Sequence, residues 1–224
     1  MPGFLDPQRY DVLGAFAVTV QLALWSAAGA LVWGTVLAAL RVSPVPVMRL
    51  FSAGYVTVVR NTPLTVIVVA ASLGLHQTLG MALGGDTAKE SGFRLAVLAL
   101  AAYTATFVCE SLRSGINSVD AGQTEAARAL GLSLRQVLVC VVFPQAFRSV
   151  VVPLATVLMS LTKNTTVAAA IGVAEAALLM KEMIENEADV MFAVFGVFAL
   201  GFVCLTLPVG LLLNLVGRRV AVRR

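Results

Sequence analysis

The chain has 224 residues, of which 59% are hydrophobic and 12% are charged, and its formal net charge is +4. A soluble domain carries roughly 25% charged residues, so this chain has too little polar surface to cover a water-soluble globule. Several runs without a charged residue exceed the roughly 20 residues that a helix needs to cross a bilayer. The composition therefore excludes an ordinary soluble protein and predicts an all-α integral membrane protein.

The apolar runs, taken in chain order, predict five membrane-spanning helices. An extracytoplasmic N-terminal tail is expected at residues 1–15, of which residues 1–11 are polar. The second span is interrupted and is treated below. The other four spans are expected at Val12–Leu40, Leu95–Leu112, Val150–Gly172 and Val190–Gly217.

The second apolar run, from Leu50 to about Leu79, is interrupted by the sequence Arg60-Asn61-Thr62-Pro63. Proline suits the first turn of a helix, and Asn or Thr before it suits the cap. Two interpretations stay open. Either the second span begins at Pro63 and residues 47–60 lie at the membrane surface, or one long helix is kinked at Pro63. The fourth span is also expected to be broken, at Pro153 and at residues 162–166.

The basic residues outside these spans are distributed unequally, and cytoplasmic loops attract Lys and Arg. The richer side therefore predicts the cytoplasmic face, with the N-terminus outside, the C-terminus inside and a basic cytoplasmic tail at residues 218–224. That side holds Arg41, Arg49, Arg113, Arg128, Arg135, Arg148, Arg218, Arg219, Arg223 and Arg224, and the other holds Arg9, Lys89, Arg94 and Lys181.

The longest polar segment between spans, residues 113–149, is expected on the cytoplasmic face. Within it, Gly131 is placed to end a short helix in the left-handed conformation, and Ser133 is placed to cap the next helix. Ala126 and Ala127 keep one side of the first helix slim. A slim, short helix outside the membrane suits insertion into a groove on another protein. From spacing alone, a solvated loop helix in which Glu125 pairs with Arg128 is the favoured interpretation.

The residues of this segment resemble a known signature. Glu125-Ala126-Ala127, followed by Gly131 and by Val141-Val142-Phe143-Pro144, resembles the EAA loop of ABC-importer membrane subunits. Val141 and Phe143 replace the usual Ile and Leu of that loop, and both changes are conservative. Further matches to polar amino acid permeases are Arg60-Asn61-Thr62-Pro63-Leu64, Glu110-x-x-Arg113-x-Gly115, Pro144-Gln145-Ala146 and Lys163-Asn164-Thr165-Thr166.

This resemblance covers residues 16–217 and is closest to permeases of the histidine, glutamine and glutamate type, above all to glutamate-uptake permeases of actinobacteria. It implies the type I ABC importer fold and a multi-pass protein of the bacterial inner (cytoplasmic) membrane. It also implies four partners besides membrane lipid. They are two ATPase subunits, a second and different permease subunit, and an extracytoplasmic solute-binding protein.

The expected activity is import of a polar amino acid, here glutamate, by alternating access. The chain has no Gly-x-x-x-x-Gly-Lys-Ser/Thr sequence with which to hold ATP. We therefore expect no enzymatic activity and no cofactor or metal on this chain, with ATP and Mg bound by the partner ATPase, and no nucleic acid partner. By resemblance, the residues that couple to the ATPase are Gln123, Glu125, Ala126, Ala127, Gly131 and Pro144.

Ionisable residues within apolar segments form a second candidate group, because such residues are costly in a membrane and usually face an interior or a partner. Either Arg60 or Lys163 meets a substrate carboxylate, or Glu110 pairs with Arg113, Arg60 or Lys163 and locks helices together. Glu110 and Arg113 are three residues apart and share one helix face. The candidates for a substrate pathway or for intramembrane ion pairs are Arg60, Thr62, Glu110, Arg113, Lys163, Asn164 and Thr165.

The sequence disfavours two other classes of function. An ion-coupled secondary carrier or a channel is disfavoured by five spans without an internal repeat and by the large cytoplasmic loop. An intramembrane protease would need a nucleophile and base, or two aspartates within spans, and neither is found.

Overall fold

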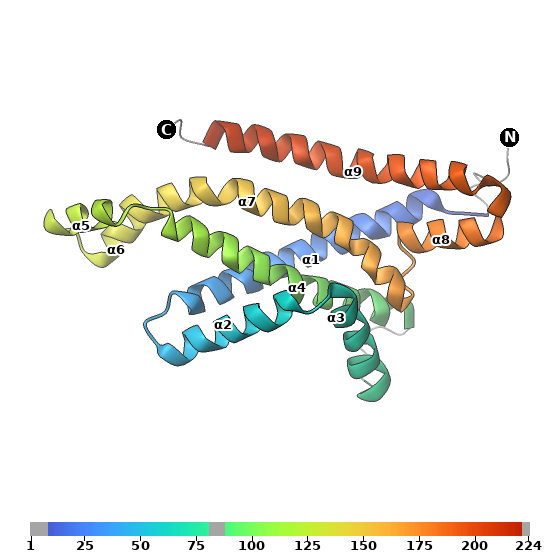
Figure 1. The fold of residues 1–224 in the computed structure, drawn as a ribbon, viewed down its shortest axis with the longest axis horizontal. Helices are drawn as coiled ribbons and strands as arrows, with labels where there is room; N and C mark the ends of the chain where they lie inside the picture. Colours follow the sequence, from blue (N-terminus) through green and yellow to red (C-terminus); the bar gives the residue numbers. More distant parts are fainter. Residues whose placement is uncertain (1–8, 81–87, 221–224) are drawn as a thin grey trace.

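The computed structural model describes residues 9–80 and 88–220, and over these ranges it contains only helices and their connections. Parts of the predicted tails, residues 1–8 and 221–224, lie outside this description. The α-helices are α1 Val12–Arg41, α2 Pro46–Asn61, α3 Leu64–Ala70, α4 Ala88–Asn117, α5 Ala121–Ala129, α6 Leu134–Val137, α7 Phe143–Asn164, α8 Ala176–Asn186 and α9 Met191–Val220 (Figure 1).

Within the described residues, four helical stretches are long and apolar enough to cross a membrane. A fifth candidate span is the bent pair made of Pro46–Asn61 and Leu64–Leu75. The prediction of an all-α protein with five spans is confirmed if this pair is counted as one span. The four continuous stretches are Val12–Arg41, Glu90–Asn117, Leu134–Ile171 and Ala188–Leu211.

Helices α1 and α4 form the centre of the molecule and lie side by side along most of their length (Figure 1). Small residues permit this close approach. A methyl group at Gly34 would lie 2.6 Å from Val108 Cβ, so only glycine fits there without movement. Close contact through small residues is the usual basis of helix packing in membranes, where lipid tails are as apolar as the side chains.

The second span is divided into two helices that meet at an angle of 103°. Helix α2 packs lengthwise against its neighbours, since the Ser52 hydroxyl donates to the Leu37 carbonyl (2.8 Å) and the Tyr55 hydroxyl donates to the Ala102 carbonyl (3.0 Å). This packing along α1 and α4 favours a place for residues 47–60 within the helix bundle over a place at the membrane surface. The bend at Thr62 and Pro63 is also much sharper than a kink, because α3 leaves the direction of α2 altogether (Figure 1).

The fourth span begins earlier than expected and runs as one helical stretch from Leu134 to Ile171. The predicted break at Pro153 is wrong, since α7 continues through this residue. Proline removes one backbone donor, which a helix in a membrane protein can tolerate. The second predicted interruption is confirmed. At Thr165 the α-helix gives way to a 3-10 helix that ends at Ile171, and Gly172 follows with φ +78°.

A buried carboxylate, that of Glu175, lies at the end of the molecule that carries α8. Glu175 precedes α8 and caps it, accepting hydrogen bonds from the backbone N–H groups of Ala177 (3.0 Å) and Leu178 (2.9 Å). Thr19 of α1 accepts a hydrogen bond from the Ala176 N–H (3.1 Å), which ties α8 to α1. The sequence places Glu175 in a polar acidic stretch, but the side chain is fully buried.

Candidate coupling site

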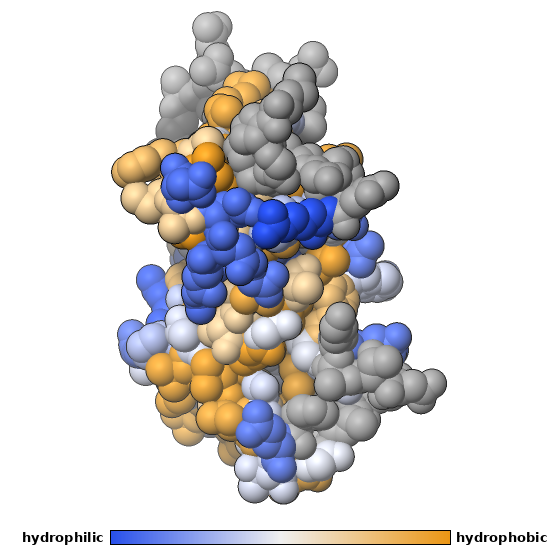
Figure 2. Space-filling view, turned by 90° about the vertical axis from the view of Figure 1, so that its right-hand side faces the viewer, coloured by the Kyte–Doolittle hydropathy of each residue, from blue (hydrophilic) through white to orange (hydrophobic). Residues whose placement is uncertain are grey.

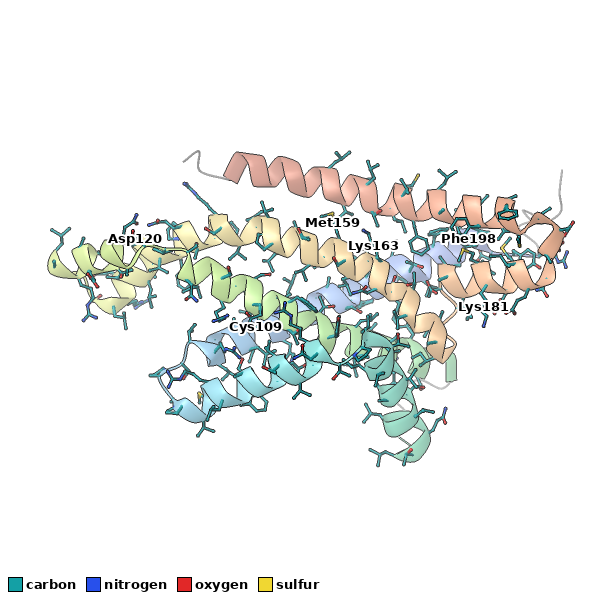
Figure 3. The ribbon with its side chains drawn as sticks, in the orientation of Figure 1. Cys109, Asp120, Met159, Lys163, Lys181 and Phe198 are labelled. Carbon is teal, nitrogen blue, oxygen red and sulfur yellow. The ribbon has the colours of Figure 1, made fainter. Side chains whose placement is uncertain are left out.

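Helices α5 and α6 lie at the opposite end of the molecule from α8, together with the α1–α2 connection and the last turns of α9 (Figure 1). Figure 3 shows the same separation through its labels for Asp120, before α5, and Lys181, on α8. Helix α5 begins where the Asp120 carboxylate accepts a hydrogen bond from the Gly122 N–H (2.7 Å). Such a cap satisfies a backbone donor that the helix itself leaves free.

Gly131 ends α5 in the left-handed conformation, with φ +84°. Its N–H donates to the Arg128 carbonyl (2.9 Å), and the Leu132 N–H donates to the Ala127 carbonyl (3.2 Å). These two bonds make a Schellman motif, which satisfies the last carbonyls of a helix. The predicted glycine end of α5 is confirmed.

Ser133 begins α6 with a capping box, in which side chain and backbone exchange hydrogen bonds with Gln136. The Gln136 N–H donates to the Ser133 hydroxyl oxygen (3.4 Å), and the Ser133 N–H donates to the Gln136 side-chain oxygen (2.9 Å). The predicted order of helix, glycine break and helix is therefore confirmed. Local side-chain chemistry fixes both ends of the turn.

A small apolar cluster holds α5 and α6 against the end of α4. Its buried members are Ala127, Val137 and Val142, and Ile116 and Val119 pack against them. Because Ala127 faces this cluster, the other face of α5 is turned outward. Side chains exposed on that outward face are Glu125, Ala126, Arg128, Ala129 and Leu130.

A second link joins α5 to α7 through two glutamines. The Gln145 side-chain amide donates to the Gln123 side-chain oxygen (2.6 Å) and to the Val141 carbonyl (3.0 Å). Pro144 lies beside Gln145 in the first turn of α7, a position that proline favours. Gln123 and Pro144 thus lie where the segment of residues 118–144 meets the membrane helices.

Helices α4 and α7 are in close contact just above this segment. A methyl group at Gly115 would lie 2.0 Å from Val150 Cγ2 and 3.1 Å from the Ala146 carbonyl oxygen. The hydroxyl of Ser118 also bonds to that of Ser149 (2.9 Å). These contacts join the end of α4 to the first turns of α7, next to α5.

The charged residues within the spans are brought together only in part. The Arg113 guanidinium donates to the Glu110 carboxylate (3.0 Å), so this predicted pair is confirmed. Arg41, at the end of α1, also lies 3.9 Å from the Glu110 carboxylate. Sequence analysis did not place Arg41 here, because no local pattern connects residues so far apart in the chain.

Arg60 and Lys163 do not reach Glu110. The Arg60 guanidinium lies over the Phe107 ring, 5.4 Å from its centroid, and the Lys163 side chain is exposed on α7 (Figure 3). Among the described residues, no carboxylate lies within ion-pair distance of either cation.

The remaining candidates lie at the two helix interruptions. The Thr62 hydroxyl donates to the Val58 carbonyl (2.8 Å) at the end of α2. The buried Thr165 hydroxyl donates to the Thr162 carbonyl (2.8 Å), next to the half-buried Asn164. Because α3 packs against the 3-10 segment that starts at Thr165, the two interruptions lie close to each other.

The match of a protein-family model decides the class of the molecule. The model, described as binding-protein-dependent transport system inner membrane component, matches residues 30–222. The chain belongs to this family. It is accordingly a multi-pass permease component of the inner membrane and is not itself a catalytic subunit. In the described residues of this permease, no group of three or more His, Cys, Asp or Glu could hold a metal ion.

Several curated relatives of the permease align over nearly its whole length. It is 52% identical over 218 residues to the glutamate transport system permease protein GluC of Corynebacterium glutamicum, and this alignment covers 96% of each chain. It is 50% identical to the protein of that name in Corynebacterium efficiens, again over 96% of each chain. A probable glutamine ABC transporter permease protein, GlnM of Bacillus subtilis, is 30% identical over 92% of each chain.

Solved structures show the same fold. The crystal structure of an amino acid ABC transporter with histidines matches with a TM-score of 0.79 and 26% identity, covering 93% of each chain. An inward-facing structure of the MetNI methionine ABC transporter matches with a TM-score of 0.75 and 18% identity, covering 97% of this chain and 99% of that one. The predicted resemblance to polar amino acid ABC permeases and the predicted fold are confirmed.

Proposed function

We propose that this permease is the membrane subunit of an ATP-driven importer of glutamate, and that α5 is the element on which a separate ATPase acts. The observation that carries the proposal is the outward face of α5, which is exposed while its opposite face is fixed to α4 and α7. The names of the two relatives at 50% identity or more support glutamate as the substrate.

The orientation follows from the two ends of the molecule. The end with α5 and α6 also carries Arg41 and Arg49, and the unequal distribution of basic residues favours this end as cytoplasmic. The end with α8 is then extracytoplasmic. This orientation places α5 where a cytoplasmic ATPase can reach it and α8 where a binding protein can reach it.

In this proposal, α5 inserts into a cleft of one of two ATPase subunits. The exposed Glu125, Ala126 and Leu130 form the contact, and Leu130 is 82% exposed in the permease alone. Closure of the ATPases on ATP draws the two coupling helices of the transporter together. The rigid contacts of α5 with α4 and α7 then turn the membrane helices between inward-facing and outward-facing arrangements.

The docking surface can be tested with Glu125→Lys and Leu130→Asp in the full-length permease. We expect both variants to insert normally and to bind the ATPase at least about tenfold more weakly, because each change affects an exposed contact. Glu185→Lys, a matched charge reversal at the α8 end, should bind the ATPase normally. Wild-type affinity for both α5 variants would exclude α5 as the docking helix.

The extracytoplasmic end offers a surface for the solute-binding protein. Figure 2 shows hydrophilic side chains gathered across the end that carries α8. The exposed acidic residues there include Glu182, Glu185 and Asp189, with the half-buried Glu187 paired with Arg9. We propose that this surface receives the solute-binding protein. Charge reversal at Glu182 and Glu185 together should reduce stimulation of ATP hydrolysis by the loaded binding protein.

The substrate pathway is proposed to pass the two neighbouring helix interruptions. Broken helices mark substrate sites in many transporters, because their free backbone groups can bind the substrate. Thr62 and Thr165 lie at these interruptions, and the nearby cations Arg60 and Lys163 could attract the carboxylates of glutamate. Under this proposal Glu110 is structural, because it pairs with Arg113 within α4 and with Arg41 at the end of α1.

A second permease subunit is proposed to cover the apolar face that α9 leaves open. Helix α9 packs mainly on α7 and α8, while its outer side chains remain exposed. We propose a different chain as the partner, by resemblance to glutamate-uptake systems. Co-expression of tagged and untagged permease would test this, since pull-down of the untagged copy would indicate a homodimer. The exposed apolar side chains include Phe192, Phe195, Leu200, Val203, Leu207 and Leu211.

A further inference from the structure

The charge cluster at the ends of α1 and α4 is not electrically balanced. It contains Arg41, Glu110 and Arg113, all partly exposed, with one carboxylate between two guanidinium groups. Glu110 can neutralise only one of these two positive charges. No other acidic side chain of the described residues lies within ion-pair distance of either arginine.

The cluster is also short of hydrogen-bond acceptors. Arg41 Nη1 and Arg113 Nε are buried and have no hydrogen-bond partner within the described part of the chain. Buried donors are nearly always paired, so two unpaired donors in one cluster need an explanation. A guanidinium group presents several donors in a fixed fork that matches phosphate or carboxylate oxygens. The cluster therefore lacks one anionic acceptor.

The depth of the cluster in the membrane limits what this acceptor can be. Helix α1 has 30 residues and is thus about 45 Å long, whereas the hydrocarbon core of a bilayer is about 30 Å thick. The ends of α1 therefore extend into the headgroup layers. Arg41 is the last residue of α1, so the cluster lies at the level of lipid phosphates.

The surface beside the cluster is suited to acyl chains. The first turns of α2 run back along the end of α1, where the Ser52 hydroxyl donates to the Leu37 carbonyl, and they expose large apolar side chains on the bilayer side of the connection. A lipid whose phosphate meets the arginines could lay its tail along this surface. These side chains are Leu50 (71% exposed) and Phe51 (54%).

We propose that Arg41 and Arg113 bind the phosphate of an anionic phospholipid, and that Glu110 holds the two guanidinium groups side by side for it. The depth of the site and its apolar border favour a lipid over free phosphate. With the proposed orientation, the lipid belongs to the cytoplasmic leaflet, whose anionic lipids attract basic residues. The proposed lipid site consists only of residues at the ends of α1 and α4. Lipid binding can be measured without transport, so its test is separate from that of the proposed function.

The test is the retention of phosphatidylglycerol by the full-length permease, purified in its complete transporter and examined by native mass spectrometry. Wild type should retain phosphatidylglycerol in preference to phosphatidylcholine. Arg41→Gln should weaken this affinity about tenfold, because it removes a charge-assisted contact. Arg49→Gln removes an exposed arginine from the neighbouring helix α2 and should retain the lipid as wild type does.

Three results would overturn the proposal. The first is that the wild-type permease shows no preference for phosphatidylglycerol. This measurement does not depend on whether any variant folds. The second is equal retention by Arg41→Gln and wild type. The third is displacement of the lipid by millimolar inorganic phosphate, which would indicate a general anion site. Arg41→Lys keeps the charge without the fork and should show a smaller loss than Arg41→Gln.

Discussion

The side-chain amide of Gln145 donates a 2.6 Å hydrogen bond to the side-chain oxygen of Gln123 and so joins membrane helix α7 to helix α5. The two residues are 22 positions apart, on either side of the glycine turn that ends α5. Because α5 is exposed on its opposite face, this bond lies between the proposed docking surface and the membrane helices.

The first prediction concerns this pair of glutamines. Gln123→Ala should lower ATP-dependent uptake about fivefold, which corresponds to about 1 kcal/mol for one lost hydrogen bond. Combining it with Gln145→Ala should add little further loss, because both changes remove the same bond. Thr124→Ala is the matched control, since the Thr124 hydroxyl bonds only within α5. Fully additive losses in the double variant would contradict the link.

The second prediction concerns Gly131. Open space surrounds the position, so a side chain there meets no clash and acts only through the backbone, where φ is +84°. Gly131→Ala should destabilise the turn by about 1–2 kcal/mol and weaken ATPase binding, measured by surface plasmon resonance on the purified permease. Gly131→Asn should have a smaller effect, because Asn tolerates this conformation better. Equal effects of Ala and Asn would count against backbone strain as the cause.

The third prediction concerns the contact between α4 and α7. Gly115→Ala should lower stability by about 1–3 kcal/mol, because the added methyl group overlaps Val150 Cγ2. The measurement is the free energy of unfolding in detergent, followed by circular dichroism. Adding Val150→Ala should restore part of the loss by making room. Gly54→Ala, where no atom lies within 4 Å of an added methyl group, should be neutral or mildly stabilising. No rescue by Val150→Ala would mean that another contact is limiting.

The fourth prediction concerns the exposed cation on α7. Lys163→Met should lower the maximal rate of glutamate uptake at least about tenfold, since a charge-assisted contact with a carboxylate would be lost. Basal ATP hydrolysis should be unaffected. Arg49→Met, which removes an exposed cation at the start of α2, serves as the control. If both variants transport at the wild-type rate, Lys163 does not contact the substrate.

Features that depend on near neighbours in the chain could be predicted from the sequence. Gly131 ends α5 and Ser133 begins α6, and the hydrogen bonds that fix both positions join residues no more than five apart in the chain. Their roles could therefore be predicted from the sequence. The Glu110–Arg113 ion pair could be predicted for the same reason, because the two residues are three positions apart on one helix.

Features that depend on tertiary packing could not be predicted. Arg41 and Glu110 are 69 residues apart, and only the close packing of α1 on α4 brings them together. Pro63 marks a helix break, but its angle of 103° depends on what α3 packs against. Glu175 looks like part of an acidic loop because its charge is visible in the sequence, whereas its burial under α1 is not.

The central claim is that this permease moves glutamate only when an ATPase drives it. The direct measurement is uptake of labelled glutamate by proteoliposomes that contain the permease, its partner permease and the ATPase, with the solute-binding protein added outside. We expect uptake that requires ATP and the solute-binding protein and that Glu125→Lys abolishes. Uptake that continues without the ATPase, or that is unchanged in Glu125→Lys, would contradict the account.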